Sequence, residues 1–358
     1  MKIIFDNIVF SLQKAGGISV VWQELISRFL KTNHEVLFLE HETDKNNIFR
    51  QKLILPDKSI IKERNLFLKI TRYLSPSVDF QDTFIFHSSY FRTCNNKNAI
   101  NVTTVHDFTY EYFYKGKRRG AFLHLWQRNR AILRSDAIIC ISENTKKDLL
   151  KFLPQVDSRK IHVINNGVSS DYHIIGEDYR YKQYAGWLLF VGHRVAYKNG
   201  EFFARSIKNT NYKVVFCGPK MSDDEIMLYD SILGRDRYIT VSQISNEELN
   251  IYYNSCLCLV YPSSYEGFGI PILEAQSAGC PVIAYNASSI PEVIGSNVTL
   301  LMNELTQEEL LNKLSLVEDE QIREQVVKDG LKNASNYSWD IIQNKYLELY
   351  TLLVHSRG

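Results

Sequence analysis

Two glutamates eight positions apart, Glu266 and Glu274, lie in the stretch YEGFGIPILE at residues 265–274. An apolar, strand-like run precedes this stretch, and Gly269 begins a helical pattern. The free N–H groups and the positive dipole end of a helix N-terminus can bind a phosphate. A carboxylate at Glu274, one turn or more into that helix, can accept hydrogen bonds from both hydroxyls of a ribose. Two solvated carboxylates around a tight turn are the structural alternative.

Two cations, Arg194 and Lys198, lie in the stretch VGHRVAYKN at residues 191–199, directly after a predicted strand. A leaving nucleoside diphosphate develops negative charge, which two fixed cations stabilise without a metal. The sequence contains no D-x-D motif, the usual ligand pattern for Mn²⁺ and a diphosphate. We therefore expect a reaction that needs neither a metal nor a cofactor. A solvated basic loop is the alternative interpretation of the two cations.

The first half of the chain offers two weaker signals. Gly16 and Gly17 form a glycine loop before a predicted helix, where a phosphate or a sugar can approach the backbone. His106 and Asp107 end a predicted buried strand, although a histidine at such a place is more often structural. The sequence contains no G-x-G-x-x-G motif, which argues against a nicotinamide-dependent dehydrogenase.

The stretch from Glu266 to Glu274 resembles the E-x7-E signature of the retaining family 4 glycosyltransferases of GT-B fold, also called glycosyltransferase group 1. The resemblance extends along the chain in the family's order. It includes Gly16-Gly17-Ile18, Val105-His106-Asp107, Ile141–Thr145, Val163–Val168, Phe190–Asn199, Ala278–Ala284, Ser289–Gly295 and Ser338-Trp339. The resemblance implies an α/β fold with two Rossmann-like domains facing across a cleft, and a C-terminal helix that crosses back to the first domain.

The resemblance also assigns roles to residues that match the family's motifs. It implies donor diphosphate binding by Arg194, Lys198, Gly17, Gly269 and Ile270. It implies donor sugar binding by His106, Glu266, Gly267, Phe268 and Gly269, and ribose binding by Glu274. The catalytic candidates are Glu266, His106 and Asp107. We expect the turn that holds Gln243 and Ile244 to line the nucleobase slot through its backbone.

A basic and aromatic segment at residues 112–135 contains no acidic residue. Its candidates for contact with a membrane or an acceptor are Lys115, Lys117, Arg118, Arg119, Arg128 and Arg130. Basic residues near an anionic membrane surface contribute roughly 1 kcal/mol each. A solvated helix face packed by its aromatic residues is the alternative, with equal weight.

Strand-like runs alternate with helical patterns in two series, which favours two parallel sheets covered on both faces. We expect an acceptor-side domain at residues 1–170, a nucleotide-sugar domain at 171–338 and a final helix at 339–358. The first series predicts strands at 2–5, 35–39, 83–87, 102–106, 137–141 and 161–164, and helices at 19–30, 121–134 and 143–151. The second predicts strands at 187–191, 213–217, 239–241, 256–261, 281–284 and 298–301, and helices at 246–255, 269–278, 307–318 and 320–335. A polar linker is expected at 169–184.

The final helix carries three aromatic residues on one stripe. Trp339, Tyr346 and Tyr350 are spaced by seven and four positions, so they need a common apolar partner. The first domain is the expected partner, and packing on the second domain alone is the alternative.

The chain has 358 residues, of which 45% are hydrophobic and 23% charged, with a net charge of +2. This composition fits two soluble domains and gives no reason to expect nucleic acid as a partner. No apolar run reaches the roughly 18 residues of a membrane-spanning helix. Six cysteines without a C-x-x-C pair favour buried, reduced thiols. We expect a cytoplasmic protein with peripheral contact at the inner face of the cytoplasmic membrane.

Residues and resemblance together predict the transfer of a hexose or deoxyhexose from a nucleoside diphosphate to a hydroxyl, with retention. GDP-mannose is the favoured donor, ahead of other GDP-, UDP- or dTDP-sugars. The favoured acceptor is a growing surface glycan on a lipid carrier, as in O-antigen or capsule.

Three alternatives from other classes stay open. A sugar-nucleotide 2-epimerase shares the fold, but the E-x7-E pattern counts against it. A two-domain solute-binding protein should begin with a signal peptide, whereas this N-terminus is typical of a strand. A non-catalytic sugar-binding scaffold would be expected to lose Glu266 or Lys198, and both are present.

Overall fold

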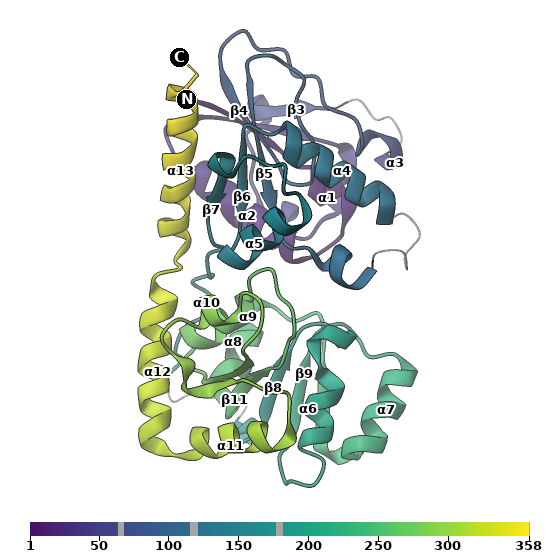
Figure 1. Cartoon of the computed structure of the whole chain (residues 1–358), viewed down its shortest axis with the longest axis vertical. Helices are drawn as coiled ribbons and strands as arrows, with labels where there is room; N and C mark the ends of the chain where they lie inside the picture. The colour runs from purple at the N-terminus through teal and green to yellow at the C-terminus, as the bar shows by residue number, and fades with distance from the viewer. Residues whose placement is uncertain (64–67, 115–120, 177–181, 358) are drawn as a thin grey trace. The chain divides into compact units, whose positions relative to one another are not determined.

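A computed structural model describes residues 1–63, 68–114, 121–176 and 182–357. The chain forms two compact units (Figure 1). The first unit comprises Met1–Gly167 and Trp339–Gly358, and the second comprises Val168–Ser338. Each unit is built on one parallel sheet with helices on both faces, so each is a Rossmann-like α/β domain.

The sheet of the first unit has seven parallel strands in the order β3-β2-β1-β4-β5-β6-β7. The strands are β1 (Lys2–Asp6), β2 (Glu35–Glu40), β3 (Ile60–Lys62), β4 (Phe84–Ser88), β5 (Ala99–Val105), β6 (Ala137–Cys140) and β7 (Ile161–Val163). Every residue of β4 and β5 is buried, as expected for strands covered on both faces. The strand order reverses between β1 and β4, and ligands of such sheets bind at the carboxyl edge beside this point.

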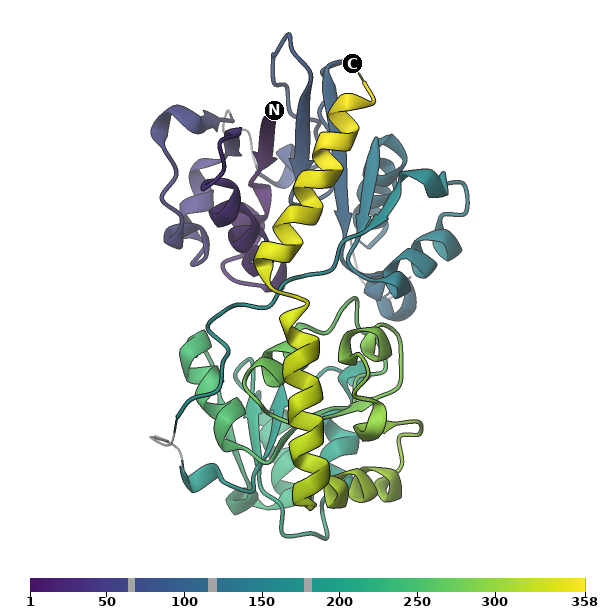
Figure 2. The same ribbon diagram turned by 90° about the vertical axis from the view of Figure 1, so that its left-hand side faces the viewer.

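Six α-helices are described in the first unit. They are α1 (Ile8–Leu12), α2 (Gly17–Phe29), α3 (Leu68–Thr71), α4 (Ala121–Arg134), α5 (Glu143–Phe152) and α13 (Trp339–His355). Helices α2 and α13 pack against each other on one face of the sheet, and α4 lies on the opposite face (Figure 1). Figure 2 shows α13, in yellow, lying across the strands of the first unit.

The final helix packs through the stripe that its aromatic spacing predicted. Trp339, Tyr346 and Tyr350 are all buried. The ring of Tyr350 lies 5.7 Å from that of Phe29 in α2, and its Oη lies 2.5 Å from Nδ1 of the buried His87 in β4. The partner of the stripe is therefore the first unit, and the alternative of packing on the second domain alone is wrong.

The sheet of the second unit has six parallel strands in the order β10-β9-β8-β11-β12-β13. They are β8 (Leu188–Val191), β9 (Val214–Cys217), β10 (Tyr238–Val241), β11 (Cys258–Tyr261), β12 (Val282–Tyr285) and β13 (Leu301–Met302). The order repeats the pattern of the first sheet, and it reverses between β8 and β11. The loops that follow β8 and β11 therefore lie where a doubly wound sheet binds its ligand.

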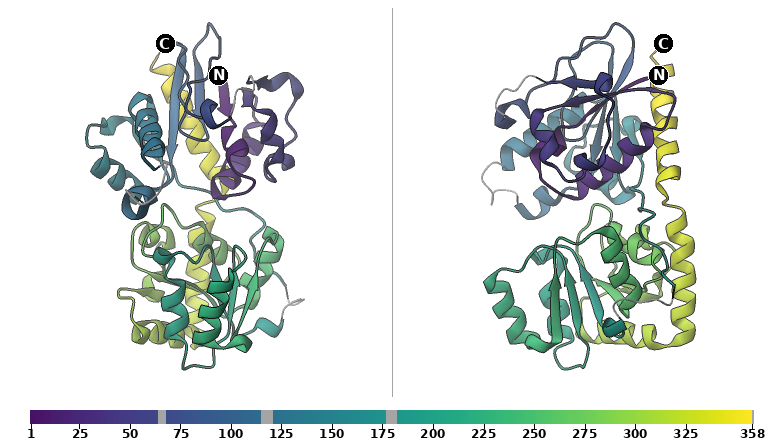
Figure 3. Two further views of the ribbon diagram at one scale, coloured as in Figure 1. Left: turned by 90° about the vertical axis from the view of Figure 1, so that its right-hand side faces the viewer. Right: turned by 180° about the vertical axis from the view of Figure 1, so that it is seen from behind.

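Seven α-helices are described in the second unit. They are α6 (Gly200–Ser206), α7 (Asp223–Leu233), α8 (Asn246–Ser255), α9 (Ile270–Ser277), α10 (Ile290–Ile294), α11 (Gln307–Glu318) and α12 (Glu320–Ser335). Figure 3 shows α6 and α7 on one side of the sheet and α8, α9 and α12 on the other. The side chains of Phe190, Phe216 and Val260 belong to the core between the sheet and its helices.

The predicted strands and helices are present with ends shifted by at most three residues, except at 298–301. There, Val298–Leu300 form a 3₁₀ turn before the short β13. The sequence patterns did not predict β3, α1, α3, α6 or α10, and for α7 they indicated only the N-cap at Ser222. All six cysteines are buried with free thiols, which confirms that prediction. Among the helices in the described ranges, none is long and apolar enough to cross a membrane.

Candidate active site

Two loops are joined at the carboxyl edge of the second sheet, where its strand order reverses. One loop, residues 192–199, follows β8, and the other, residues 262–269, follows β11. Asn199 joins them: its Nδ2 donates to the carbonyl of Pro262 at 2.8 Å and to Oγ of Ser264 at 2.7 Å. Its backbone is left-handed, with φ 54°, a conformation that asparagine tolerates better than most residues. The two loops therefore form one surface.

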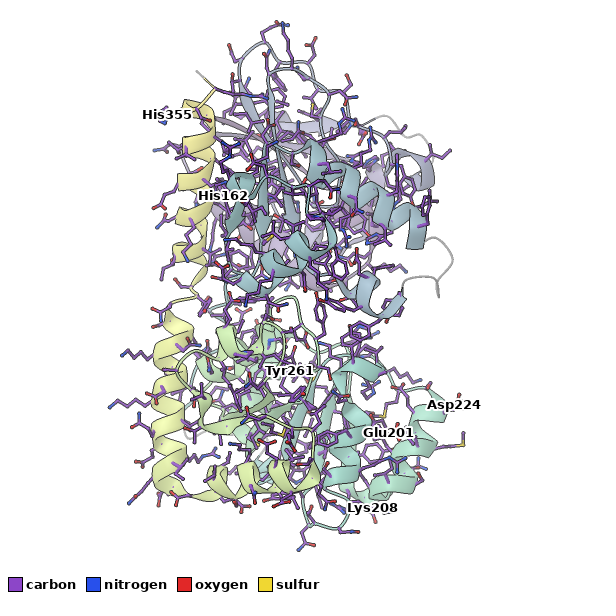
Figure 4. All side chains as sticks on the ribbon, in the orientation of Figure 1. His162, Glu201, Lys208, Asp224, Tyr261 and His355 are labelled. Atoms are coloured by element: carbon purple, nitrogen blue, oxygen red, sulfur yellow. The ribbon has the colours of Figure 1, made fainter. Side chains whose placement is uncertain are left out.

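Lys198 and Glu266, one from each loop, form an ion pair. Nζ of Lys198 lies 2.5 Å from Oε1 of Glu266 and donates a second hydrogen bond to Oη of Tyr261 at 3.4 Å. The two charged side chains are 14% and 11% exposed, and Tyr261 lies inside the unit (Figure 4). The sequence predicted both charged residues in the donor site but did not predict that they bind each other. A ligand entering here must contact or separate this pair.

Two serines fix the backbone around Glu266. Oγ of Ser288 accepts the N–H of Glu266 at 2.8 Å and donates to its carbonyl at 2.7 Å. The buried Ser289 donates to the carbonyl of Phe268 at 2.8 Å. Ser288 itself has φ 52°, a costly conformation for a residue that is not glycine. Sequence reasoning missed this role for Ser288, although Ser289 opens one of the stretches that carry the family resemblance.

Helix α9 begins directly after Gly269, whose φ of 108° favours glycine. Pro271 lies in its first turn, where a missing N–H costs no hydrogen bond. The helix N-terminus that the sequence predicted is therefore present, with Ile270 as its first residue. The side chain of Phe268 is buried and its ring lies 5.9 Å from that of Tyr337, so only its backbone is available to a donor.

Glu274 lies in the second turn of α9 and is partly buried. Oη of Tyr253 donates to its Oε2 at 2.9 Å, and the buried Tyr172 interacts with the same carboxylate. Burial raises the pKa of Glu274 to about 7, against the two tyrosine hydrogen bonds, which favour the charged form. Sequence reasoning singled out Glu274 but neither tyrosine.

Arg194 already has partners in the second unit. Its Nε lies 2.9 Å from Oε1 of Glu225, and its Nη2 donates to the carbonyl of Pro219 at 2.6 Å. The side chain is only 3% exposed. Against the effect of burial, the backbone of Ser222 and the guanidinium of Arg194 lower the pKa of Glu225. Binding of a diphosphate by Arg194 remains a prediction, and it requires a change in these contacts.

The candidate residues of the first unit lie at the carboxyl edge of its sheet. Helix α2 begins at Gly17, and His106 directly follows β5. Burial lowers the pKa of His106 to about 4, against the charge of Asp107, so the imidazole is neutral at neutral pH. Oδ1 of Asp107 accepts the N–H of Thr109 at 2.9 Å. A neutral imidazole can both donate to and accept from a hydroxyl, as the predicted sugar subsite requires.

The predicted nucleobase turn connects β10 to α8. Gln243 is exposed and has φ 58°, and Ile244 is partly buried. Oγ of Ser245 accepts the N–H of Glu248 at 3.2 Å and caps α8. The unusual backbone at Gln243 is compatible with a binding turn, and its role remains a prediction.

The expectation that Arg128 lies on a membrane or acceptor surface is wrong. Arg128 is 2% exposed, forms an ion pair with Glu111 and lies with its guanidinium 4.5 Å from the centre of the Phe108 ring. The reason is that Glu111, one residue before the basic segment, neutralises this arginine within the first unit. Arg130 is partly exposed, with its guanidinium 5.4 Å from the centre of the Trp126 ring.

The other predicted surface cations, Lys115, Lys117, Arg118 and Arg119, lie outside the described residues.

Comparison with known proteins identifies the family. The family model for glycosyl transferases group 1 matches residues 182–333, and that for Glycosyltransferase Family 4 matches residues 15–172. O-antigen chain mannosyltransferase B of Escherichia coli is 24% identical over 394 residues, which cover 99% of this chain and 100% of that protein.

Two solved structures share the fold of this chain. Sucrose-phosphate synthase of Thermosynechococcus elongatus matches with a TM-score of 0.78 at 18% identity, over 99% of this chain and 100% of that one. HepE of Anabaena, solved with UDP and glucose, matches with a TM-score of 0.73 at 14% identity, over 98% and 99%. With the two family models matching in succession along the chain, the protein belongs to the group 1 glycosyltransferases of family 4, which have the GT-B fold.

Proposed function

We propose that this glycosyltransferase transfers a hexose or deoxyhexose from a nucleoside-diphosphate sugar to a hydroxyl, with retention at the anomeric carbon. The observation that carries the proposal is the Lys198–Glu266 pair at the strand-order reversal of the second sheet. The N-terminus of α9 follows Glu266 after the three residues 267–269, and Glu274 lies in the second turn of this helix. One unit thus offers a cation and N–H groups to a diphosphate, and carboxylates to a sugar and a ribose.

In the proposed reaction the acceptor oxygen forms a bond to the anomeric carbon as the bond from that carbon to the diphosphate oxygen breaks. The acceptor proton passes to the leaving phosphate oxygen on the same face of the sugar. Lys198 and the N–H groups of α9 stabilise the charge on the leaving group. Glu266 orients the sugar and stabilises positive charge near its ring. No covalent intermediate on the enzyme is required.

The same set of groups supports a reaction without a divalent metal. Lys198 supplies one cation to the diphosphate, and Arg194 supplies a second once it exchanges Glu225 for the ligand. For His106 and Asp107 of the first unit, contact with a sugar is proposed. Gly17, at the start of α2, would present backbone to the donor.

GDP-mannose is the proposed donor and a growing lipid-linked surface glycan the proposed acceptor. Both rest on the relative named as an O-antigen chain mannosyltransferase. A UDP-sugar is the second candidate donor, because HepE was solved with UDP and glucose. The deciding experiment incubates purified protein with a panel of GDP-, UDP- and dTDP-sugars and measures released nucleoside diphosphate. With a lipid-linked glycan present as acceptor, fastest release from GDP-mannose is expected, and no release from any donor would refute the proposed function.

Peripheral contact with an anionic membrane is proposed for the exposed side of α4. Phe122 is 79% exposed and Trp126 is 46% exposed. These two residues, with Arg130 and Arg134, line a cavity of about 630 Å³. Aromatic side chains beside arginines match the chemistry of a lipid headgroup interface.

A further inference from the structure

Glu274 has two tyrosine partners from different parts of the second unit. Tyr253 comes from α8, and Tyr172 comes from the segment that follows the end of the first unit at Gly167. Both tyrosines are buried, and their rings pack edge to face with centroids 5.8 Å apart. Tyr253 donates to the Glu274 carboxylate at 2.9 Å, and Tyr172 interacts with the same carboxylate. A carboxylate accepts about four hydrogen bonds, so positions remain for the two hydroxyls of a ribose.

Three asparagines of α8 fix the segment that carries Tyr172. Asn246 donates to the carboxylate of Asp171 at 2.8 Å. Oδ1 of Asn250 accepts the N–H of His173 at 3.1 Å, and Oδ1 of Asn254 accepts the N–H of Ile175 at 2.9 Å.

The asparagines recur every fourth residue and therefore lie on one face of the helix. Asparagine is a poor residue for a helix interior, so its repetition indicates a requirement for these bonds. This part of the predicted polar linker is therefore a fixed arm of the second unit.

We propose that Tyr172 and Tyr253 are positioning residues that hold the Glu274 carboxylate for the two hydroxyls of a ribose, and so favour ribonucleotides over 2′-deoxyribonucleotides. This inference rests on the proposed function, which places a nucleoside diphosphate at Glu274. Because two tyrosines hold the carboxylate in one orientation, its remaining lone pairs point in a fixed direction toward the ligand. A site built to accept from both hydroxyls discriminates against a ligand that lacks one of them.

The ionisation of Glu274 provides a readout that a purely structural role would not move. Tyr172, Tyr253, Cys217 and Tyr261 are the titratable groups that interact with this carboxylate. Because the hydroxyls donate to the charged form, nucleotide affinity should fall as pH drops through about 7, the pKa to which burial raises Glu274. Removing a tyrosine hydroxyl removes a bond to the charged form, so the midpoint should move to higher pH.

The test uses the full chain and calorimetry with GDP, UDP and their 2′-deoxy forms between pH 6 and 9. Tyr172→Phe and Tyr253→Phe should each weaken binding of the preferred ribonucleotide by roughly tenfold. Binding of the 2′-deoxy form should change less, and the pH midpoint should rise. Tyr212→Phe is the matched control, because Tyr212 donates to Glu318 at 2.8 Å in another tyrosine–glutamate pair. Ionisation of the phosphate is common to all variants and cancels in the comparison.

The outcomes separate the inference from the function on which it rests. If the wild-type chain binds neither GDP nor UDP, the proposed donor site falls and the inference falls with it. If Glu274→Ala weakens binding but both tyrosine variants keep wild-type affinity and pH midpoint, the inference alone is overturned. Should Tyr253→Phe fail to fold, Asn254→Ala replaces it. This change releases the arm that carries Tyr172 without touching the carboxylate, and it should also reduce the preference for ribose.

Discussion

The ammonium of Lys198 and the carboxylate of Glu266 form an ion pair, with Nζ and Oε1 2.5 Å apart, between the loops that follow β8 and β11. Both side chains are largely buried. Removing either one would therefore leave the other as an uncompensated buried charge. A bound diphosphate would offer Lys198 a second anion. The two roles that the family resemblance assigns to these residues are therefore coupled.

Glu266→Gln should separate nucleotide binding from turnover. The substitution keeps the shape of the side chain but removes its charge, which leaves Lys198 free to bind the diphosphate. We expect the affinity for the free nucleoside diphosphate to be unchanged or higher. We expect kcat to fall by roughly 10²–10³-fold, the usual effect of removing one group that stabilises transition-state charge. Calorimetry and the release of nucleoside diphosphate measure the two quantities.

Two controls sharpen this comparison. Lys208, an exposed lysine labelled in Figure 4, is the control position for Lys198. Lys208→Ala should leave both the nucleotide affinity and kcat unchanged. Lys198→Ala should lower both. A Glu266→Gln variant that keeps wild-type kcat would remove Glu266 from the chemistry.

Glu274→Ala should weaken binding of the free nucleoside diphosphate. The expected loss is about 1.5–3 kcal/mol, the range for hydrogen bonds to a charged group. Calorimetry of the folded variant measures it, and Glu201→Ala, which removes an exposed glutamate of α6, is the control. Unchanged affinity for every nucleotide of the panel would show that Glu274 does not bind the ribose.

Much of the fold was predictable because the apolar runs of parallel strands are continuous and their connecting helices are amphipathic. Strand β3 was not predicted because it has three residues, and the strand predicted at 298–301 overlaps the two-residue β13 only at Leu301. Helices α1, α6 and α10 are short, with five to seven residues, and do not establish a helical period. The polar segment around Tyr172 resembled a linker because the asparagines that bind it come from α8, about 80 positions later.

Candidate residues of the site could be named where a local motif contains them, whereas contacts between residues distant in the sequence could not be predicted. Glu266 and Lys198 were found singly, whereas their ion pair joins positions 68 apart. Arg128 was misassigned because charge patterning reports sequence neighbours and not burial. Ser288 gives no periodic signal, since its role depends on a left-handed backbone and a contact 22 positions away.

Activity should persist after exhaustive treatment with EDTA. In the proposed reaction, Lys198, Arg194 and the N-terminus of α9 would supply the positive charge for the diphosphate. Release of nucleoside diphosphate before and after chelation, and after addition of Mg²⁺ or Mn²⁺, measures this. Activity that disappears with EDTA and returns only with a divalent metal would contradict the proposal.

The exposed side of α4 should bind anionic membranes. Phe122→Ser with Trp126→Ser should reduce sedimentation with vesicles rich in phosphatidylglycerol, because both rings lie exposed. Leu352→Ser, which removes a 60% exposed leucine from α13, is the control. Equal pelleting of all three proteins would favour a solvated helix face.

The basic part of the same segment gives a separate test. Replacing Lys117, Arg118 and Arg119 with Ser should reduce vesicle binding most clearly at low salt, where electrostatic attraction is least screened. Binding that is lost equally at low and high salt would point to a contribution other than charge.

The contact between His87 and Tyr350 joins α13 to the sheet of the first unit. Nδ1 of His87 lies 2.5 Å from Oη of Tyr350, and its Nε2 lies 2.8 Å from Oγ1 of Thr104. The histidine is fully buried. Burial, with the nearby His106, lowers the pKa of His87 to about 3, so the folded protein holds it neutral.

In the unfolded chain, His87 has the ordinary histidine pKa of about 6.5 and takes up a proton below that pH. The first unit should therefore lose stability as the pH falls below about 6.5. The folded chain takes it up only near pH 3, so one such group costs about 1.4 kcal/mol of unfolding free energy per pH unit between these values. His87→Gln keeps hydrogen-bonding groups but does not titrate, and it should flatten the pH dependence by this amount. Urea unfolding between pH 7 and 4 measures both proteins, and other histidines cancel in the difference. Identical slopes would show that His87 is already charged in the folded state or that the unfolded chain keeps its environment.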